Sequence, residues 1–260
     1  MTRILRIVAV AACLAAAAGC ITSGTKAPLP ASGTDAAQYN LQLGISYFRQ
    51  GKYDAAKEKL QRALAQDPNL ATAHTALALV YERLEDPDGA EREHRRAAAL
   101  APDDPDVQNA LGVFLCAQRD RQAEALRVFD KAIAIPLSKK TVNRAMLYTN
   151  AGTCAKYSDL PRAEAYLRRA LAEAPNFPDA LLQLAEVSLA QGNGLAARAF
   201  LERYLGARGP TAPALLLGSR IEAALGDAPA AARYAQQLRT DFPTAAEVRQ
   251  LDAPAGTAGP

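Results

Sequence analysis

The chain has 260 residues, half of them hydrophobic, and a formal net charge of +3. Aromatic residues make up 6% and tryptophan is absent, so we expect a core of alanine and aliphatic side chains. No stretch of Lys and Arg is interleaved with aromatic residues, which argues against nucleic-acid binding. The abundance of Ala, Leu, Arg, Glu and Gln favours helix.

The N-terminus has the pattern of a secretory signal. Arg3 and Arg6 precede an apolar run over 7–18, which is shorter than a membrane-spanning helix. The run ends in Ala17-Ala18-Gly19-Cys20, which resembles a bacterial lipobox, with Ala17 standing where Leu is usual. The lipobox predicts that residues 1–19 are removed and that Cys20 is acylated and inserted in lipid. The alternative is an ordinary secretory signal that happens to contain Cys20.

The residue after Cys20 bears on localisation. In lipoproteins of the enteric type, Asp at this place signals retention at the inner membrane, but here it is Ile21. This convention predicts a lipid anchor in the outer membrane, with the chain facing the periplasm. Residues 20–35 are rich in Ser, Thr, Gly and Pro and predict a flexible tether.

A period of about 34 residues runs through the rest of the chain. Prolines end Ala-rich segments at 68, 102, 136, 175, 210 and 243. The first of three small-residue places holds Gly44, Ala78, Gly112, Gly152, Ala185 and Ser219. The second holds Ala56, Ala90, Ala125, Ala163, Ala197 and Ala231. The third holds Ala63, Ala97, Ala132 and Ala170, then Tyr204 and Leu238.

This pattern resembles the tetratricopeptide repeat, in which two antiparallel helices approach so closely that only small side chains fit between them. The resemblance implies an all-α fold: a right-handed superhelical solenoid of about six helix hairpins over residues 36–250. The expected repeats are 37–70, 71–104, 105–138, 141–177, 178–211 and 212–245. The link 136–144 is longer than the period allows. Residues 251–260 are expected to form a disordered tail.

The first helix of each hairpin in such a solenoid lines a concave face, so its side chains report on the ligand. Leu41, Ile45 and Phe48 form one apolar stripe with i, i+4, i+7 spacing. The predicted partner-binding groove continues through the matching positions of the next two repeats: Thr75, Leu79, Glu82, Arg83, Asn109 and Val113. An apolar groove suits an amphipathic helix or an extended peptide. The alternative is that Leu41 and Ile45 pack against the second repeat.

Two cysteines, Cys116 and Cys154, fall on the first helices of the third and fourth repeats. An exported chain meets an oxidising compartment, which permits a disulfide between them; two buried free thiols are the alternative. His74 and His94 fall at packing positions of the repeat. Because no metal-ligand spacing, phosphate loop or nucleophile elbow is present, we expect no enzyme, metal or cofactor.

Three features resemble the PilF/PilW-type type IV pilus biogenesis lipoproteins: Asn109-Ala-Leu-Gly-Val-Phe-Leu-Cys116, the long link after Pro136, and Asn150-Ala-Gly-Thr-Cys154-Ala. Segments 175–185 and 235–243 fit the same family. The resemblance implies a monomeric pilotin that binds the type IV pilus secretin subunit through its N-terminal repeats. Such a protein promotes secretin localisation and multimerisation in the outer membrane, and so pilus assembly and twitching motility. The competing hypothesis is a general envelope scaffold for peptidoglycan enzymes or outer-membrane protein insertion.

Overall fold

The computed structural model describes residues 33–118, 120–136 and 143–252. The expected signal, Cys20, most of the tether, the greater part of the link 136–144 and residues 253–260 of the expected tail lie outside these ranges. Every regular element in the described ranges is an α-helix. None of these helices combines the length and the apolar character that a membrane span requires.

Twelve of the described helices pair into six antiparallel hairpins, one for each expected repeat. The all-α solenoid expected from the period is therefore confirmed. The hairpins are α1 (Gly33–Arg49) with α2 (Tyr53–Gln66), α3 (Ala71–Arg83) with α4 (Pro87–Leu100), α5 (Pro105–Cys116) with α6 (Gln122–Ala134), α7 (Arg144–Ala155) with α8 (Leu160–Glu173), α9 (Pro178–Ala190) with α10 (Gly194–Arg208), and α11 (Ala212–Ala224) with α12 (Ala228–Asp241).

Local sequence signals start many of these helices. A side-chain oxygen at the N-cap satisfies backbone N–H groups that have no partner within the first turn. Asp86 accepts such a bond from Gly89 N at 2.8 Å, and Asp227 accepts one from Ala230 N at 2.9 Å. Proline occupies the first turn of α4, α5, α8, α9, α11 and α12, where its missing N–H costs nothing.

The small residues of the period lie where the two helices of a hairpin touch. A Cβ added to Gly112 would lie 2.7 Å from Phe129 Cε1, and one added to Gly152 would lie 2.6 Å from Leu167 Cγ. Because Phe129 and Leu167 are fully buried, neither can move aside. Close packing of the hairpins therefore depends on these glycines.

The sixth repeat corrects the expected register by one residue. The small residue opposite Tyr234 is Gly218, whose added Cβ would lie 2.8 Å from Tyr234 Cδ1, and not Ser219. Similarly, Ala230 is buried whereas Ala231 is half-buried. Because Gly218 is followed by Ser219 and Ala230 by Ala231, the period alone did not show which small residue lies at the helix contact. The close packing of the two helices in the hairpin decides the register.

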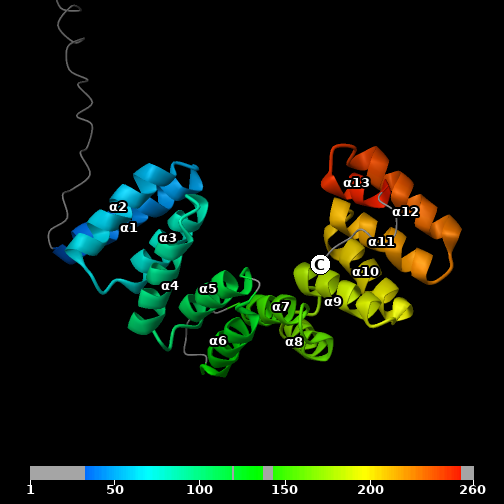
Figure 1. The fold of residues 1–260 in the computed structure, drawn as a ribbon, viewed down its shortest axis with the longest axis horizontal. Helices are drawn as coiled ribbons and strands as arrows, with labels where there is room; N and C mark the ends of the chain where they lie inside the picture. The colour runs from blue at the N-terminus through cyan, green and yellow to red at the C-terminus, as the bar shows by residue number, and fades with distance from the viewer. Residues whose placement is uncertain (1–32, 119, 137–142, 253–260) are drawn as a thin grey trace, which may run out of the picture.

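Successive hairpins stack into an arch, with α1 and α2 at one end and α11 to α13 at the other (Figure 1). The first helices contact one another in series, α1 with α3, α3 with α5, α5 with α7, α7 with α9 and α9 with α11. In Figure 1, α5, α7, α9 and α11 lie on the side that faces the opening of the arch. We call this continuous surface the inner face.

A thirteenth helix, α13 (Ala246–Asp252), was not expected from the period. It packs against α11 and α12, and its Val248 and Leu251 join a cluster built around Leu215 and Leu238. The last hairpin would otherwise leave this apolar surface in water, and a solenoid needs a cap at its end. The helix also takes in residues 251 and 252, which the sequence analysis assigned to the tail.

Candidate protein-binding groove

Three apolar side chains follow one another along the inner face at the N-terminal half of the arch. Ile45 on α1, Leu79 on α3 and Val113 on α5 hold the same position of their repeats. Ile45 is half-buried, whereas Leu79 is 38% and Val113 45% exposed. Since α1, α3 and α5 lie in series, these side chains form one line, which we call the apolar row.

The structure moves Leu41 out of the predicted groove. Its side chain is 4% exposed and belongs to the main core cluster, so its assignment to an open groove was wrong. Because α3 packs beside α1, the side of α1 that carries Leu41 is covered. Ile45 and Phe48 are half-buried against the same cluster, and the Phe48 ring lies 5.7 Å from that of Tyr53. Leu41 thus belongs to the core, whereas Ile45 and Phe48 remain partly accessible on the surface of the helix.

The polar residues predicted for the groove differ in what holds them. Thr75 Oγ1 donates to the carbonyl oxygen of Ala71, 3.1 Å away within the same helix. Arg83 is exposed at the end of α3. Asn109 Oδ1 accepts a hydrogen bond from Asn150 Nδ2 at 3.0 Å, which links α5 to α7.

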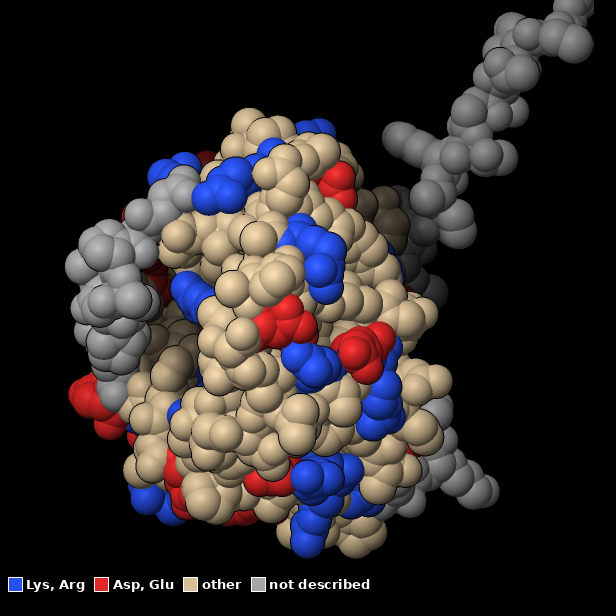
Figure 2. All heavy atoms as spheres, turned by 90° about the vertical axis from the view of Figure 1, so that its right-hand side faces the viewer, with Lys and Arg blue, Asp and Glu red and all other residues tan. Residues whose placement is uncertain are grey.

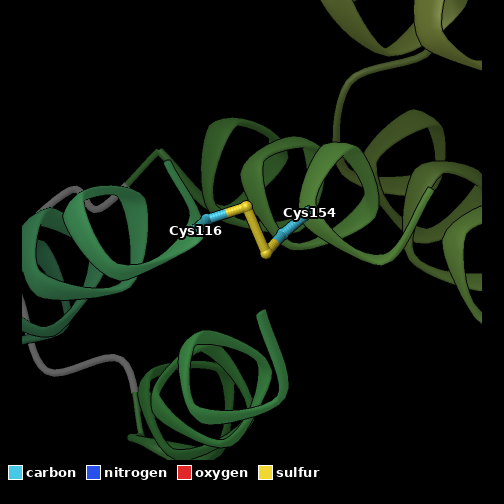
Figure 3. Close-up of a disulfide and its surroundings, with 2 residues drawn as sticks. All are labelled: Cys116 and Cys154. Atoms are coloured by element: carbon cyan, nitrogen blue, oxygen red, sulfur yellow. A yellow bond between two sulfur atoms is a disulfide. The ribbon is translucent and has the colours of Figure 1, made fainter. Parts of the chain in front are cut away.

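A disulfide joins the same two helices. Cys116 and Cys154 are bonded, with their Cα atoms 5.7 Å apart, a normal separation for a disulfide. Figure 3 shows Cys116 at the end of its helix, with its sulfur meeting that of Cys154 on the neighbouring helix. Together with the Asn109–Asn150 bond, it fixes the junction between the third and fourth repeats, where the connecting link is lengthened.

Beside this disulfide the inner face is hollowed into a pocket of about 640 Å³. Val113, at the end of the apolar row, lines one side, and Tyr157, 65% exposed, lines another. The remaining lining comes from Cys116, Ala117, Gln122, Phe129, Asn150, Thr153 and Ser158. The apolar row therefore ends in a recess of a size that accepts a large side chain.

Beyond this recess polar side chains take the place of the apolar row. Thr153 and Glu186 follow on α7 and α9, and Lys156 Nζ donates to Glu186 Oε2 at 2.5 Å and to Gln183 Oε1 at 2.8 Å. A second pocket of about 590 Å³ lies there. Its lining combines apolar and polar side chains: Leu189, Ala190, Pro213, Leu216 and Leu217 with Lys156, Glu186, Arg220, Glu247 and Gln250. Figure 2 views the molecule from its C-terminal side, where positive and negative side chains are interspersed and neither sign forms one patch. The apolar row is thus confined to α1, α3 and α5, because Thr153 and Glu186 hold the matching positions on α7 and α9.

Both histidines are buried, as their repeat positions suggested, but each also contacts a carboxylate, which sequence reasoning missed. His74 Nδ1 lies 2.5 Å from Glu93 Oε2, and His74 Nε2 lies 3.1 Å from the carbonyl oxygen of Pro68. Burial disfavours the charged ring, but the bonds to Glu93 and Pro68 outweigh it, so the pKa of His74 is raised above its usual 6.5. His94 Nε2 lies 2.7 Å from Glu82 Oε1.

Within the described ranges, no group of three or more His, Cys, Asp or Glu side chains converges as metal ligands would. The chemistry that the inner face offers is that of contact: apolar side chains, a recess and a few fixed polar groups. An apolar groove lined by helices is of the kind that suits an amphipathic helix or an extended peptide.

Comparisons with known proteins agree with this fold and extend it. Family models of the tetratricopeptide repeat match residues 44–85, 71–114 and 156–221. The type IV pilus assembly protein PilF of Pseudomonas aeruginosa is 31% identical over 238 residues, which cover 90% of this chain and 93% of PilF.

Two solved structures give the same result. The crystal structure of PilW, described as a widely conserved type IV pilus biogenesis factor, matches with a TM-score of 0.77 and 33% identity, over 84% of this chain and 98% of PilW. A structure of Pseudomonas aeruginosa PilF matches with a TM-score of 0.72 and 28% identity, over 85% of this chain and 98% of that one.

Proposed function

Because this chain belongs to the family of type IV pilus assembly proteins that includes PilF and PilW, we propose that it is a pilotin for the type IV pilus secretin. It binds the secretin subunit and promotes its localisation and multimerisation in the outer membrane, which permits pilus extrusion and twitching motility. It acts without catalysis, as a monomer, held on the outer membrane by acylated Cys20 and facing the periplasm.

The observation that carries this proposal is the apolar row. Leu79 and Val113 are large apolar side chains partly open to water on neighbouring helices, beside a recess that can accept a further side chain. Contiguous apolar surface of this kind marks interaction sites on soluble proteins. A secretin segment that lays apolar side chains along the inner face would remove this surface from water. The family relationship supports a partner in pilus assembly, and the apolar row is the surface to which we propose that the secretin binds.

The experiment is a deletion strain complemented with variants. We expect deletion to abolish heat-resistant secretin multimers and wild type to restore them. Leu79→Glu with Val113→Glu should fail to restore them, because two buried carboxylates disfavour an apolar interface. Leu195→Glu is the matched control, since Leu195 is 69% exposed but lies on α10, a second helix outside the inner face.

Normal secretin multimers in the deletion strain would contradict the pilotin function. If piliation also stayed normal and peptidoglycan enzymes or outer-membrane insertion components co-purified with the protein, the general envelope scaffold would replace it.

A further inference from the structure

One charged side chain interrupts the apolar stretch of the inner face. Glu82 follows Leu79 by three residues on α3, so the two side chains share a face of that helix. Its repeat position is held by Phe48 on α1 and by Cys116 on α5. Its side chain is 34% exposed. A carboxylate thus stands among the apolar groups that a partner would cover.

A buried histidine holds one oxygen of this carboxylate. His94 Nε2 lies 2.7 Å from Glu82 Oε1, and the His94 side chain is 1% exposed. The ring of Phe114, with its centroid 5.0 Å away, packs against the imidazole. The imidazole itself is fixed by the packing of the hairpin, so it fixes the direction in which Glu82 points.

The same histidine leaves the negative charge of Glu82 uncompensated. His94 Nδ1 is buried and has no hydrogen-bond partner. A proton on that nitrogen would be a buried donor without an acceptor, which is costly. The neutral ring, with its proton on Nε2, fits the site: it donates to Glu82 and adds no positive charge.

Among the described residues, no Lys or Arg forms an ion pair with the Glu82 carboxylate. Arg83 on the same helix and Arg49 at the end of α1 are exposed, and the ion pairs among the described residues join neither of them to Glu82. Its bonding partner there is His94. The groove therefore presents one oriented carboxylate with an unpaired charge.

We propose that Glu82 reads a basic side chain of the bound segment: a Lys or Arg of the secretin subunit pairs with Glu82 while apolar side chains cover Leu79 and Val113. This assignment rests on the proposed function. Covering the groove removes water from around Glu82, which strengthens a pair with a cation. A segment without a cation at this position would bury the Glu82 carboxylate unpaired. The free-energy cost of burying that charge disfavours binding of such a segment. Glu82 thereby determines which segment binds, whereas the apolar row contributes apolar contact area.

The test uses the full-length protein in detergent and the purified secretin subunit of the same organism, with affinity measured over a range of salt concentrations. Glu82→Gln keeps the shape and the contact with His94 but removes the charge. We expect it to weaken binding by about fivefold or more and to reduce the salt dependence. Glu58→Gln is the control, because Glu58 lies on α2 with a side chain 55% exposed and pairs with Lys59 and Arg62.

A charge swap identifies the partner residue. Glu82→Lys should weaken binding further, and one Lys→Glu or Arg→Glu substitution in the secretin segment should restore it. If Glu82→Gln binds as wild type does, with the same salt dependence, the inference is overturned and the pilotin function stands. If wild type binds no secretin, the pilotin function fails, and this inference fails with it.

The positioning role of His94 has a separate readout. His94→Leu should weaken binding when Glu82 is present but have no further effect in the Glu82→Gln background, as a double-mutant cycle measures. An equal loss in both backgrounds, or a loss of helical circular dichroism in His94→Leu that His94→Gln does not share, would show that His94 acts only through the fold.

Discussion

Cys116 on α5 and Cys154 on α7 are joined by a disulfide whose Cα atoms lie 5.7 Å apart. The loop that it closes contains the whole of α6 and the lengthened link between the third and fourth repeats. In a solenoid each hairpin is held only by its neighbours. A covalent bond between two first helices therefore secures the junction beside which the apolar row ends.

Removing this bond should destabilise the protein measurably. For a sequence separation of 38 residues, the loss of loop-closure entropy predicts that Cys116→Ala/Cys154→Ala lowers the free energy of unfolding by about 2–4 kcal/mol. Urea denaturation followed by circular dichroism measures the difference. Reductant should lower the stability of wild type to that of the double variant and leave the variant unchanged. A wild type that is insensitive to reductant would contradict a structural role for the bond.

The glycines of the hairpin contacts give a second prediction with an internal control. Gly112→Ala places a methyl group against the buried ring of Phe129 and should destabilise by about 1–3 kcal/mol through overpacking. Gly206, within α10, has no heavy atom within 4 Å of an added Cβ. Gly206→Ala should therefore stabilise by about 0.5–1 kcal/mol through helix propensity and reduced entropy of the unfolded chain. Equal effects of the two substitutions would refute the packing argument.

The His74–Glu93 pair should make stability depend on pH in one direction. The folded-state pKa of His74 is raised above 6.5, so the protonated ring stabilises the fold. This contribution is complete below pH 6.5 and is lost as the pH rises through the raised pKa. Melting temperatures measured between about pH 6 and 9 should fall more in wild type than in Glu93→Gln, because the substitution removes the charge that favours the imidazolium. Parallel pH profiles would contradict this account of His74.

Acylation of Cys20, which lies outside the described residues, is tested by substitution. Cys20→Ser should move the protein from the outer-membrane fraction to the soluble periplasmic fraction, because the acyl chains supply the membrane affinity. Metabolic labelling with palmitate should mark wild type and not the variant. Membrane retention of Cys20→Ser together with an unlabelled wild type would indicate an ordinary secretory signal.

Much of the fold could be predicted from the sequence because steric demand repeats with the period. The small residues at Gly44, Gly112 and Gly152 and the prolines between repeats report directly on close helix contacts. The register failed at Gly218 because a second small residue follows it. The period did not predict α13, because this helix belongs to no repeat. Its Val248 and Leu251 cover the end of the solenoid, which exists only once the hairpins are stacked.

The site was harder to predict, for a physical reason. Periodicity says which helix face a residue shares, but not how closely the next repeat covers it. Leu41 and Val113 both fall on the predicted groove, yet one is 4% and the other 45% exposed. The contact between His94 and Glu82 crosses from α4 to α3 and depends on helix rotation. A buried histidine at a packing position, with a carboxylate twelve residues before it, was the one signal available.

The proposed function requires that the open apolar groove bind the secretin. Its most direct test is a pull-down from detergent-solubilised envelope with the full-length protein as bait, identified by mass spectrometry, for wild type, Leu79→Glu/Val113→Glu and the Leu195→Glu control. We expect the secretin to be the dominant protein captured by wild type and by the control. The groove variant should lose the secretin while its circular dichroism stays helical. Equal capture of secretin by all three baits would contradict the groove, and capture of other envelope machinery without secretin would contradict the function.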